Sequence, residues 1–176
     1  KDFSVGVTEE EYLALQTVIN RQVSFNGWFT KENVRESLTS LSKQLTINSL
    51  KEWTSMYTFN EKPKVIALIM AGNIPLVGFH DFLSVLISGN SVVAKLSSTD
   101  KTLLPALGMH LIEFVPELKN RIVFSTGRIG DVDAVIATGS DNSEQYFEQY
   151  FGKYPHIFRK NRTSIAVLNG KETEAD

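Results

Sequence analysis

The sequence has 176 residues, 42 % of them hydrophobic, a size that suits one domain, or one domain with a small appendage, around a sizeable core. Its 18 Lys and Arg against 20 Asp and Glu give a net charge of -2, which argues against a nucleic-acid surface, and no run approaches the ~20 apolar residues of a membrane span. The chain contains no cysteine, which excludes disulfides and thiolate chemistry within it, and without a signal-peptide pattern we expect a cytoplasmic protein.

Residues 1–62 have the spacing of helices. Thr8 and Glu11 form a capping box before an apolar stripe, and Thr30 and Thr46 are placed to cap two further helices. We therefore expect a small helical segment before the main domain.

From residue 63 onward, short apolar runs alternate with helical patterns. The run "KVIALIM" has no polar alternation, which is typical of a strand buried on both faces. The pattern predicts an α/β fold in residues 63–176: a Rossmann-like parallel sheet with helices on both faces. The expected strands are 64–70, 91–95, 121–124, 133–138, 156–159 and 164–168, and the expected helices are 75–88, 102–115 and 142–152.

Small or polar residues lie at the ends of three of these strands. They are Ala71-Gly72-Asn73, then Lys95 with Ser97-Ser98, and Thr138-Gly139-Ser140. Ligands of such sheets bind at the carboxyl ends of the strands, so we expect these residues to gather there.

Each of these groups has a structural and a functional interpretation. Asn73 suits a turn, but its amide could also donate to an oxyanion. Lys95 could be a surface lysine or could hold ribose hydroxyls or a phosphate. Gly139-Ser140 precede a helix whose amide groups would favour a phosphate, while Asp141 or Asn142 could simply cap that helix.

Two other features have plainer interpretations. No pair of the three histidines has metal-site spacing, so we expect no metal, and His80 is expected to be partly buried and hydrogen-bonded. Residues 146–162 mix aromatic and basic side chains, which suggests stacking on single-stranded RNA or, more simply, core-facing aromatics before a basic loop.

The order and spacing of "IMAGNIPL", "ISGNSVVAKLSS" and "DAVIATGS" resemble the cofactor half of the aldehyde dehydrogenase superfamily. More closely, "YFGKYPHIFRKNRTSIAVLNG" is similar to the acyl-CoA reductase family that includes the fatty acyl reductase subunit of bacterial bioluminescence. The resemblance covers residues 28–170 and is specific in 64–170. It implies an aldehyde dehydrogenase-like cofactor domain that serves NADPH-dependent reduction of an acyl-CoA to an aldehyde, through an acyl-enzyme on a Cys.

The resemblance also implies roles for single residues. Asn73 would stabilise the oxyanion of the reaction, and Lys95 would hold the adenosine ribose. Gly139-Ser140 would lie at the pyrophosphate, Gly127 against the adenine, and Ala71-Gly72 along the cofactor with their backbone.

Three departures from the superfamily pattern refine the expectation. Ser98 stands where an acidic residue would repel a 2′-phosphate, which favours NADPH, with NADH as the alternative. Arg159 stands where hydrolytic members have the glutamate that activates water, which favours a thiol such as CoA as the acyl carrier. Few residues separate "STG" from "DVDAV", so we expect this crossover to lack its usual helix.

The nucleophilic Cys of the family lies in a separate catalytic domain, and this chain contains none. We therefore expect a fragment that binds cofactor without catalysing the reaction; a homodimer is usual in the superfamily. Two alternatives stay open: a non-catalytic nucleotide-binding or scaffold module, and RNA binding through residues 146–162.

Overall fold

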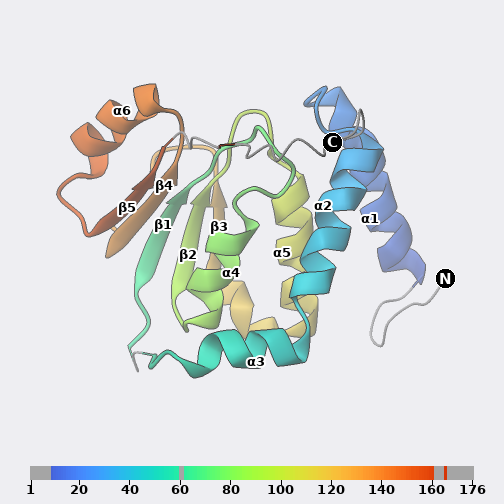
Figure 1. The fold of residues 1–176 in the computed structure, drawn as a ribbon, viewed down its shortest axis with the longest axis horizontal. Helices are drawn as coiled ribbons and strands as arrows, with labels where there is room; N and C mark the ends of the chain where they lie inside the picture. The colour runs from blue at the N-terminus through green and yellow to red at the C-terminus, as the bar shows by residue number, and fades with distance from the viewer. Residues whose placement is uncertain (1–8, 60–61, 161–164, 166–176) are drawn as a thin grey trace, which may run out of the picture.

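The structure, a computed structural model, describes residues 9–59, 62–160 and 165, and within them five parallel strands form one sheet (Figure 1). The strand order is β3-β2-β1-β4-β5. Their bounds are β1 (Val65–Ile69), β2 (Ser91–Lys95), β3 (Ile122–Ser125), β4 (Ala134–Thr138) and β5 (His156–Arg159). The predicted Rossmann-like parallel sheet is therefore confirmed. The strand expected over 164–168 lies outside the described residues, apart from Ile165.

The helices lie on both faces of the sheet, as predicted. Ile66 and Leu68 of β1 belong to a large core that includes residues of α4 (Phe79–Ile87) and α5 (Leu103–Phe114). Ala67 points the other way, into a smaller cluster with Phe147 and Phe151 of α6 (Asp141–Phe151). Successive strand residues face opposite sides, so α6 covers the face opposite to α4 and α5.

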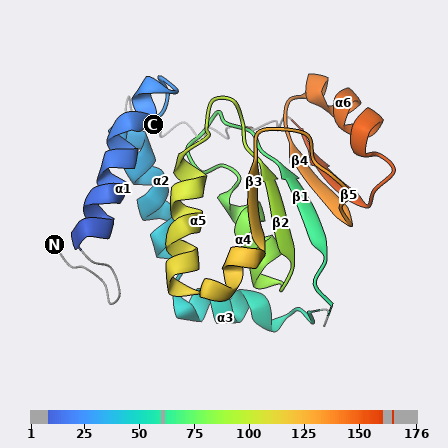
Figure 2. The same ribbon diagram turned by 180° about the vertical axis from the view of Figure 1, so that it is seen from behind.

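Three further helices precede the sheet, and the first two of them contribute side chains to its larger core. They are α1 (Glu9–Arg21), α2 (Lys31–Gln44) and α3 (Ile47–Ser55), and a 3-10 turn η1 (Gln22–Ser24) follows α1. Phe29 and Val34 are fully buried in the same cluster as Leu68. Figure 2 shows α1 and α2 beside α5, at the end of the molecule opposite to α6. The division into units 1–62 and 63–176 stays a prediction.

Local signals set most helix ends as expected. Thr30 and Thr46 each accept a hydrogen bond from the amide three residues on, at 3.2 Å, and so cap α2 and α3. Gly89 ends α4 at a φ of 84°, a left-handed conformation that suits glycine. The predicted capping box of Thr8 and Glu11 lies outside what the structure describes, since Thr8 and the Glu11 side chain are not described.

The start of α4 corrects the sequence interpretation. The helix expected from Pro75 begins at Phe79, because Leu76 adopts a φ of 61°, outside the helical range. The intervening residues form turns instead: the Val77 amide donates to Ile74 O at 3.2 Å, and the Phe79 amide to Leu76 O at 2.9 Å. A positive φ is unfavourable for a leucine. Leu76 is nevertheless part of the core, with only 6 % of the residue exposed.

The connection between β3 and β4 contains no helix, as predicted. Residues 126–133 cross directly, and Ile129 and Val132 of this loop pack against the smaller cluster. Without a crossover helix over β3, Val123 is 52 % exposed. In α/β sheets the point where the strand order reverses, here between β1 and β4, is where ligands bind.

Candidate functional site

The strand ends that carry the candidate residues are neighbours. Ile69, the last residue of β1, pairs with Lys95 of β2 on one side and with Ala137 of β4 on the other. Because all strands are parallel, the residues that follow β1 and β4 and those at the end of β2 lie along one edge, on both sides of the β1–β4 switch point. The structure therefore brings together the three groups that the sequence predicted.

Asn73 lies exposed at this edge, in the turn after β1. Its side chain makes no hydrogen bond within the described part of the chain, so it does not serve as a turn-forming acceptor. It borders a pocket of about 430 Å³ between this turn and α2, which Trp28 and Glu36 also line. The preceding Gly72 is buried, and Ala71 is half-buried.

Lys95 ends β2 with a half-buried side chain. Its carbonyl oxygen accepts a hydrogen bond from the Met70 amide at 3.1 Å, which ties the end of β1 to the end of β2. Among the described residues, the Lys95 ammonium has neither an ion-pair nor a hydrogen-bond partner. Beyond it, Ser97 is half-buried and Ser98 is exposed. An ammonium group in this setting can donate hydrogen bonds to a ribose hydroxyl or to a phosphate.

Ser140 is the residue that precedes α6, rather than Asp141 or Asn142, whose predicted alternative role as the cap is wrong. Ser140 has the extended backbone of a cap residue, but its side chain makes no capping bond and contacts Ser143 Oγ at 3.2 Å instead. A side-chain oxygen would normally satisfy an amide of the first turn. The first turn of α6 therefore lacks the side-chain acceptor that its N-cap residue could supply.

The two candidate glycines near β3 and β4 differ in their surroundings. A Cβ on Gly139 would lie 2.8 Å from Ser143 Cβ and 3.0 Å from the Phe147 ring, so only glycine allows β4 to meet α6 this closely. A Cβ on Gly127 would meet only Ser125 Oγ, at 3.9 Å. Gly127 is exposed in the loop after β3 and leaves room for a ligand beside it.

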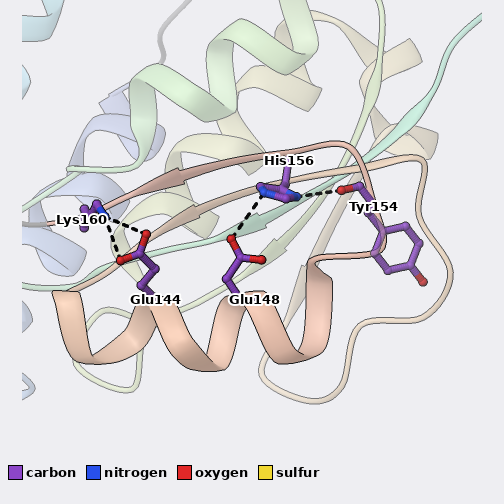
Figure 3. Close-up of polar contacts among 5 residues, drawn as sticks. All are labelled: Glu144, Glu148, Tyr154, His156 and Lys160. Atoms are coloured by element: carbon purple, nitrogen blue, oxygen red, sulfur yellow. Dashed lines mark hydrogen bonds and ion pairs between the residues drawn. The ribbon is translucent and has the colours of Figure 1, made fainter.

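The segment 146–162 is described up to residue 160. Phe147 and Phe151 pack into the smaller cluster, while Lys160 makes an ion pair with Glu144 at 2.8 Å (Figure 3). Arg159 contacts Asp81 of α4 at 2.8 Å. Phe147 and Phe151 are therefore core-facing, as expected, but Tyr146 and Tyr150 of the same helix are 63 % and 64 % exposed. RNA binding is not tested by these contacts.

The surroundings of His80 contradict one further expectation. The prediction for His80 is wrong: its side chain is 67 % exposed and lies beside the Trp53 ring, because this position of α4 faces outward. Within the residues that the structure describes, no group of three or more His, Asp or Glu could hold a metal ion. Over the same residues, no helix has both the length and the apolar character needed to cross a membrane.

Sequence reasoning missed three polar residues that shape this edge: Asn26, Asp81 and Thr99. Asn26 and Thr99 both donate to the carbonyl oxygen of Gly72, and Asp81 holds Arg159. The only local signal was the Asn26-Gly27 pair, which marks a turn but not its partner.

Comparison with known proteins gives one result. The family model described as acyl-CoA reductase (LuxC) matches residues 7–171. Searches of curated proteins and of solved structures find no match. The resemblance to the wider aldehyde dehydrogenase superfamily stays a prediction. The match spans nearly the whole sequence, and the chain therefore belongs to the acyl-CoA reductase (LuxC) family.

Proposed function

We propose that this chain is the cofactor-binding part of an NADPH-dependent acyl-CoA reductase. Membership of the acyl-CoA reductase family supports the reaction class and fits a nicotinamide cofactor. The observation that carries the proposal is the meeting of three strand ends at the β1–β4 switch point: Asn73 after β1, Lys95 on β2 and Gly139-Ser140 after β4.

The residues at this edge fit such a cofactor. Lys95 has an ammonium without a partner in the described chain, suited to the adenosine ribose. The first turn of α6, after Gly139-Ser140, has an unfilled side-chain cap and the positive end of the helix dipole, which suits the pyrophosphate. The backbone of Ala71-Gly72 would run along the cofactor and Gly127 would face the adenine. When bound, the nicotinamide nucleotide supplies a hydride.

Asn73 is proposed as the oxyanion donor. In the complete reductase, a Cys thiolate supplied from outside this chain attacks the thioester carbonyl, the carbon–sulfur bond to CoA breaks, and CoA leaves. The carbonyl oxygen gains negative charge in this step and again when the acyl group is reduced to the aldehyde. A fixed amide N–H at that oxygen stabilises both transition states, an effect of about 3–4 kcal/mol for comparable donors.

The preference for NADPH rests on Ser98, with NADH as the alternative. This residue is exposed three positions after Lys95 and carries no charge to repel a 2′-phosphate. The substrate is proposed to be an acyl-CoA, consistent with an arginine, Arg159, where a water-activating glutamate would stand. The cytoplasmic location and a homodimer stay predictions.

The proposal is tested by titrating the complete protein with NADPH and following nucleotide fluorescence. Lys95→Met should weaken NADPH binding at least tenfold, while Lys119→Met, on an exposed 3-10 turn (η2, Pro116–Asn120), should leave it unchanged. Asn73→Ala should lower kcat by roughly 10²–10³ with nearly unchanged NADPH affinity. Equal losses of turnover and affinity in Asn73→Ala would indicate a structural role.

The same experiment addresses the alternatives. Tight NADPH binding without turnover of any acyl-CoA by the complete protein would favour the non-catalytic nucleotide-binding or scaffold module. Absence of NADPH binding together with salt-sensitive binding of a single-stranded RNA would favour an RNA-binding role for residues 146–162.

A further inference from the structure

Two side chains from distant parts of the sequence hold the carbonyl oxygen of Gly72, directly before Asn73. Asn26 Nδ2 lies 3.0 Å from this oxygen, and Thr99 Oγ1 lies 2.9 Å from it. A carbonyl oxygen has two lone pairs, so these two donors complete its usual hydrogen bonding. Because the Gly72–Asn73 peptide is planar, fixing its oxygen also fixes the direction in which the chain enters Asn73.

The direction of each hydrogen bond on the Thr99 side can be assigned. The single hydroxyl hydrogen of Thr99 goes to Gly72 O, which can only accept. In the 3.0 Å contact between Ser97 Oγ and Thr99 Oγ1, Ser97 is therefore the donor. A Cβ on Gly72 would lie 2.4 Å from Ser97 Oγ and 2.5 Å from Thr99 Oγ1, so glycine is required for this approach.

On the other side, Asn26 is itself held in place. Its Oδ1 accepts from the Trp28 amide at 3.0 Å, so Nδ2 is the atom that faces Gly72. The Asn26 amide donates to Gln22 O at 3.0 Å, and Asn26 O accepts from the amide of the fully buried Phe29 at 2.9 Å. The N-terminal helical segment therefore reaches the edge of the sheet with a rigid donor.

Asn73 has no such support of its own. Its side chain is exposed and makes no hydrogen bond among the described residues, so only the backbone can set the direction of its amide. We infer that Asn26 and Thr99 are positioning residues for Asn73, acting through the Gly72 carbonyl. This inference rests on the proposed role of Asn73 as the oxyanion donor.

The test uses the complete reductase with saturating NADPH and acyl-CoA. Asn26→Asp keeps the acceptor for the Trp28 amide but loses the donor to Gly72, and Thr99→Val removes the hydroxyl at nearly constant shape. Each should lower kcat roughly 10- to 100-fold, because small misplacements of a catalytic group have effects of this size. Thr99→Ser restores a hydroxyl and should recover most of the activity.

Two control variants lose similar hydrogen bonds elsewhere. Thr54→Val removes a hydroxyl that donates to Leu50 O at 2.7 Å within α3, and Asn90→Asp removes a donor to Ser88 Oγ at 2.9 Å after α4. Both residues are half-buried and lie away from the Gly72 carbonyl, so kcat should stay within about twofold of the wild type. A similar loss of kcat in these controls would overturn the inference, because the effect would then be general destabilisation.

A double-mutant cycle gives a readout that a merely structural role would not move, and hydrogen exchange shows which segment of the chain the variants loosen. If Asn26 acts through Asn73, Asn26→Asp should lower kcat no further in the Asn73→Ala background. Amide exchange over residues 71–79 should be faster in Asn26→Asp and Thr99→Val than in the wild type and in both controls. Additive losses of kcat, or unchanged exchange, would overturn the inference.

These results distinguish a failure of the oxyanion role of Asn73 from a failure of the positioning role of Asn26 and Thr99. If Asn73→Ala keeps full kcat, the proposed oxyanion role fails, and the positioning role fails with it. If Asn73→Ala lowers kcat but Asn26→Asp and Thr99→Val do not, only the positioning role fails.

Discussion

Arg159, the last residue of β5, makes an ion pair with Asp81 in the first turn of α4. Arg159 Nη1 lies 2.8 Å from Asp81 Oδ1 and 3.0 Å from Asp81 Oδ2, across a sequence separation of 78 residues. The Asp81 side chain is only 9 % exposed, so this carboxylate depends on its partner for compensation. Arg159 therefore has a structural role: it joins the edge strand β5 to α4, the helix that follows the central strand β1.

Loss of this arginine should destabilise the fold. Arg159→Leu leaves a largely buried Asp81 carboxylate with only the exposed His80 ring nearby, 3.8 Å away. Breaking a fully buried pair costs about 3–5 kcal/mol; because Arg159 is one-third exposed, we expect about 2 kcal/mol. Urea unfolding of the complete protein measures this. As a control, Glu144→Gln breaks the more exposed pair with Lys160 and should change the free energy of unfolding by less than about 1 kcal/mol. Equal losses in both variants would contradict the prediction.

Gly139→Ala should weaken both the fold and NADPH binding. The new methyl group would lie 2.8 Å from Ser143 Cβ, so α6 must shift away from β4, at a cost of about 1–3 kcal/mol. The shift moves the first turn of α6 and should raise the Kd for NADPH. Gly130→Ala is the matched control, because a Cβ at Gly130 meets nothing within 4 Å. Thermal unfolding and nucleotide titration measure the two effects, and wild-type values for Gly139→Ala would refute the argument.

Ser98→Glu should reverse the cofactor preference. A carboxylate at this exposed position would repel the 2′-phosphate of NADPH. It would also accept hydrogen bonds from the ribose hydroxyls of NADH. We expect the ratio of the two Kd values to change at least tenfold in favour of NADH. Ser98→Gln adds the same length without charge and should change the ratio much less. A wild-type preference for NADH would remove the basis of the prediction.

The buried carboxyl of Asp100 should make the free energy of unfolding depend on pH. Burial raises the pKa of the Asp100 carboxyl, although hydrogen bonds from the Leu103 and Thr102 amides oppose the change; within the described residues, its Oδ1 is buried without a partner. The pKa of Asp100 is therefore higher in the folded state than in the unfolded state. At a pH below the unfolded-state pKa, this carboxyl makes its full contribution to the free energy of unfolding. That contribution is lost as the pH rises through the folded pKa.

Asp100→Asn removes this titration. The free energy of unfolding of the wild type, relative to the variant, should therefore fall as the pH rises above 3.8, the ordinary pKa of this carboxyl. Urea unfolding at several pH values measures the difference. A constant difference at all of these pH values would show that the Asp100 pKa is the same in the folded and unfolded states.

The strands could be predicted because their pattern is local. A run such as Val65–Ile69 is apolar at every position because β1 is the central strand, with neighbours on both edges and helices on both faces. The caps at Thr30 and Thr46 and the end of α4 at Gly89 likewise depend on residues within a few positions of each other. The start of α4 could not be predicted this way, since burial of Leu76 against the core outweighs the preference of Pro75 for a first helical turn.

The sequence by itself determined the parallel α/β fold and the placement of Asn73, Lys95 and Gly139-Ser140 on one edge, because apolar periodicity predicts parallel strands and the carboxyl ends of such strands share an edge. Only the tertiary structure decided how that edge is held together. The bonds from Asn26 and Thr99 to Gly72 span 46 and 27 residues, and no local pattern marks either partner. Such contacts depend on how the helices pack on the sheet, since packing alone brings these donors to one carbonyl oxygen.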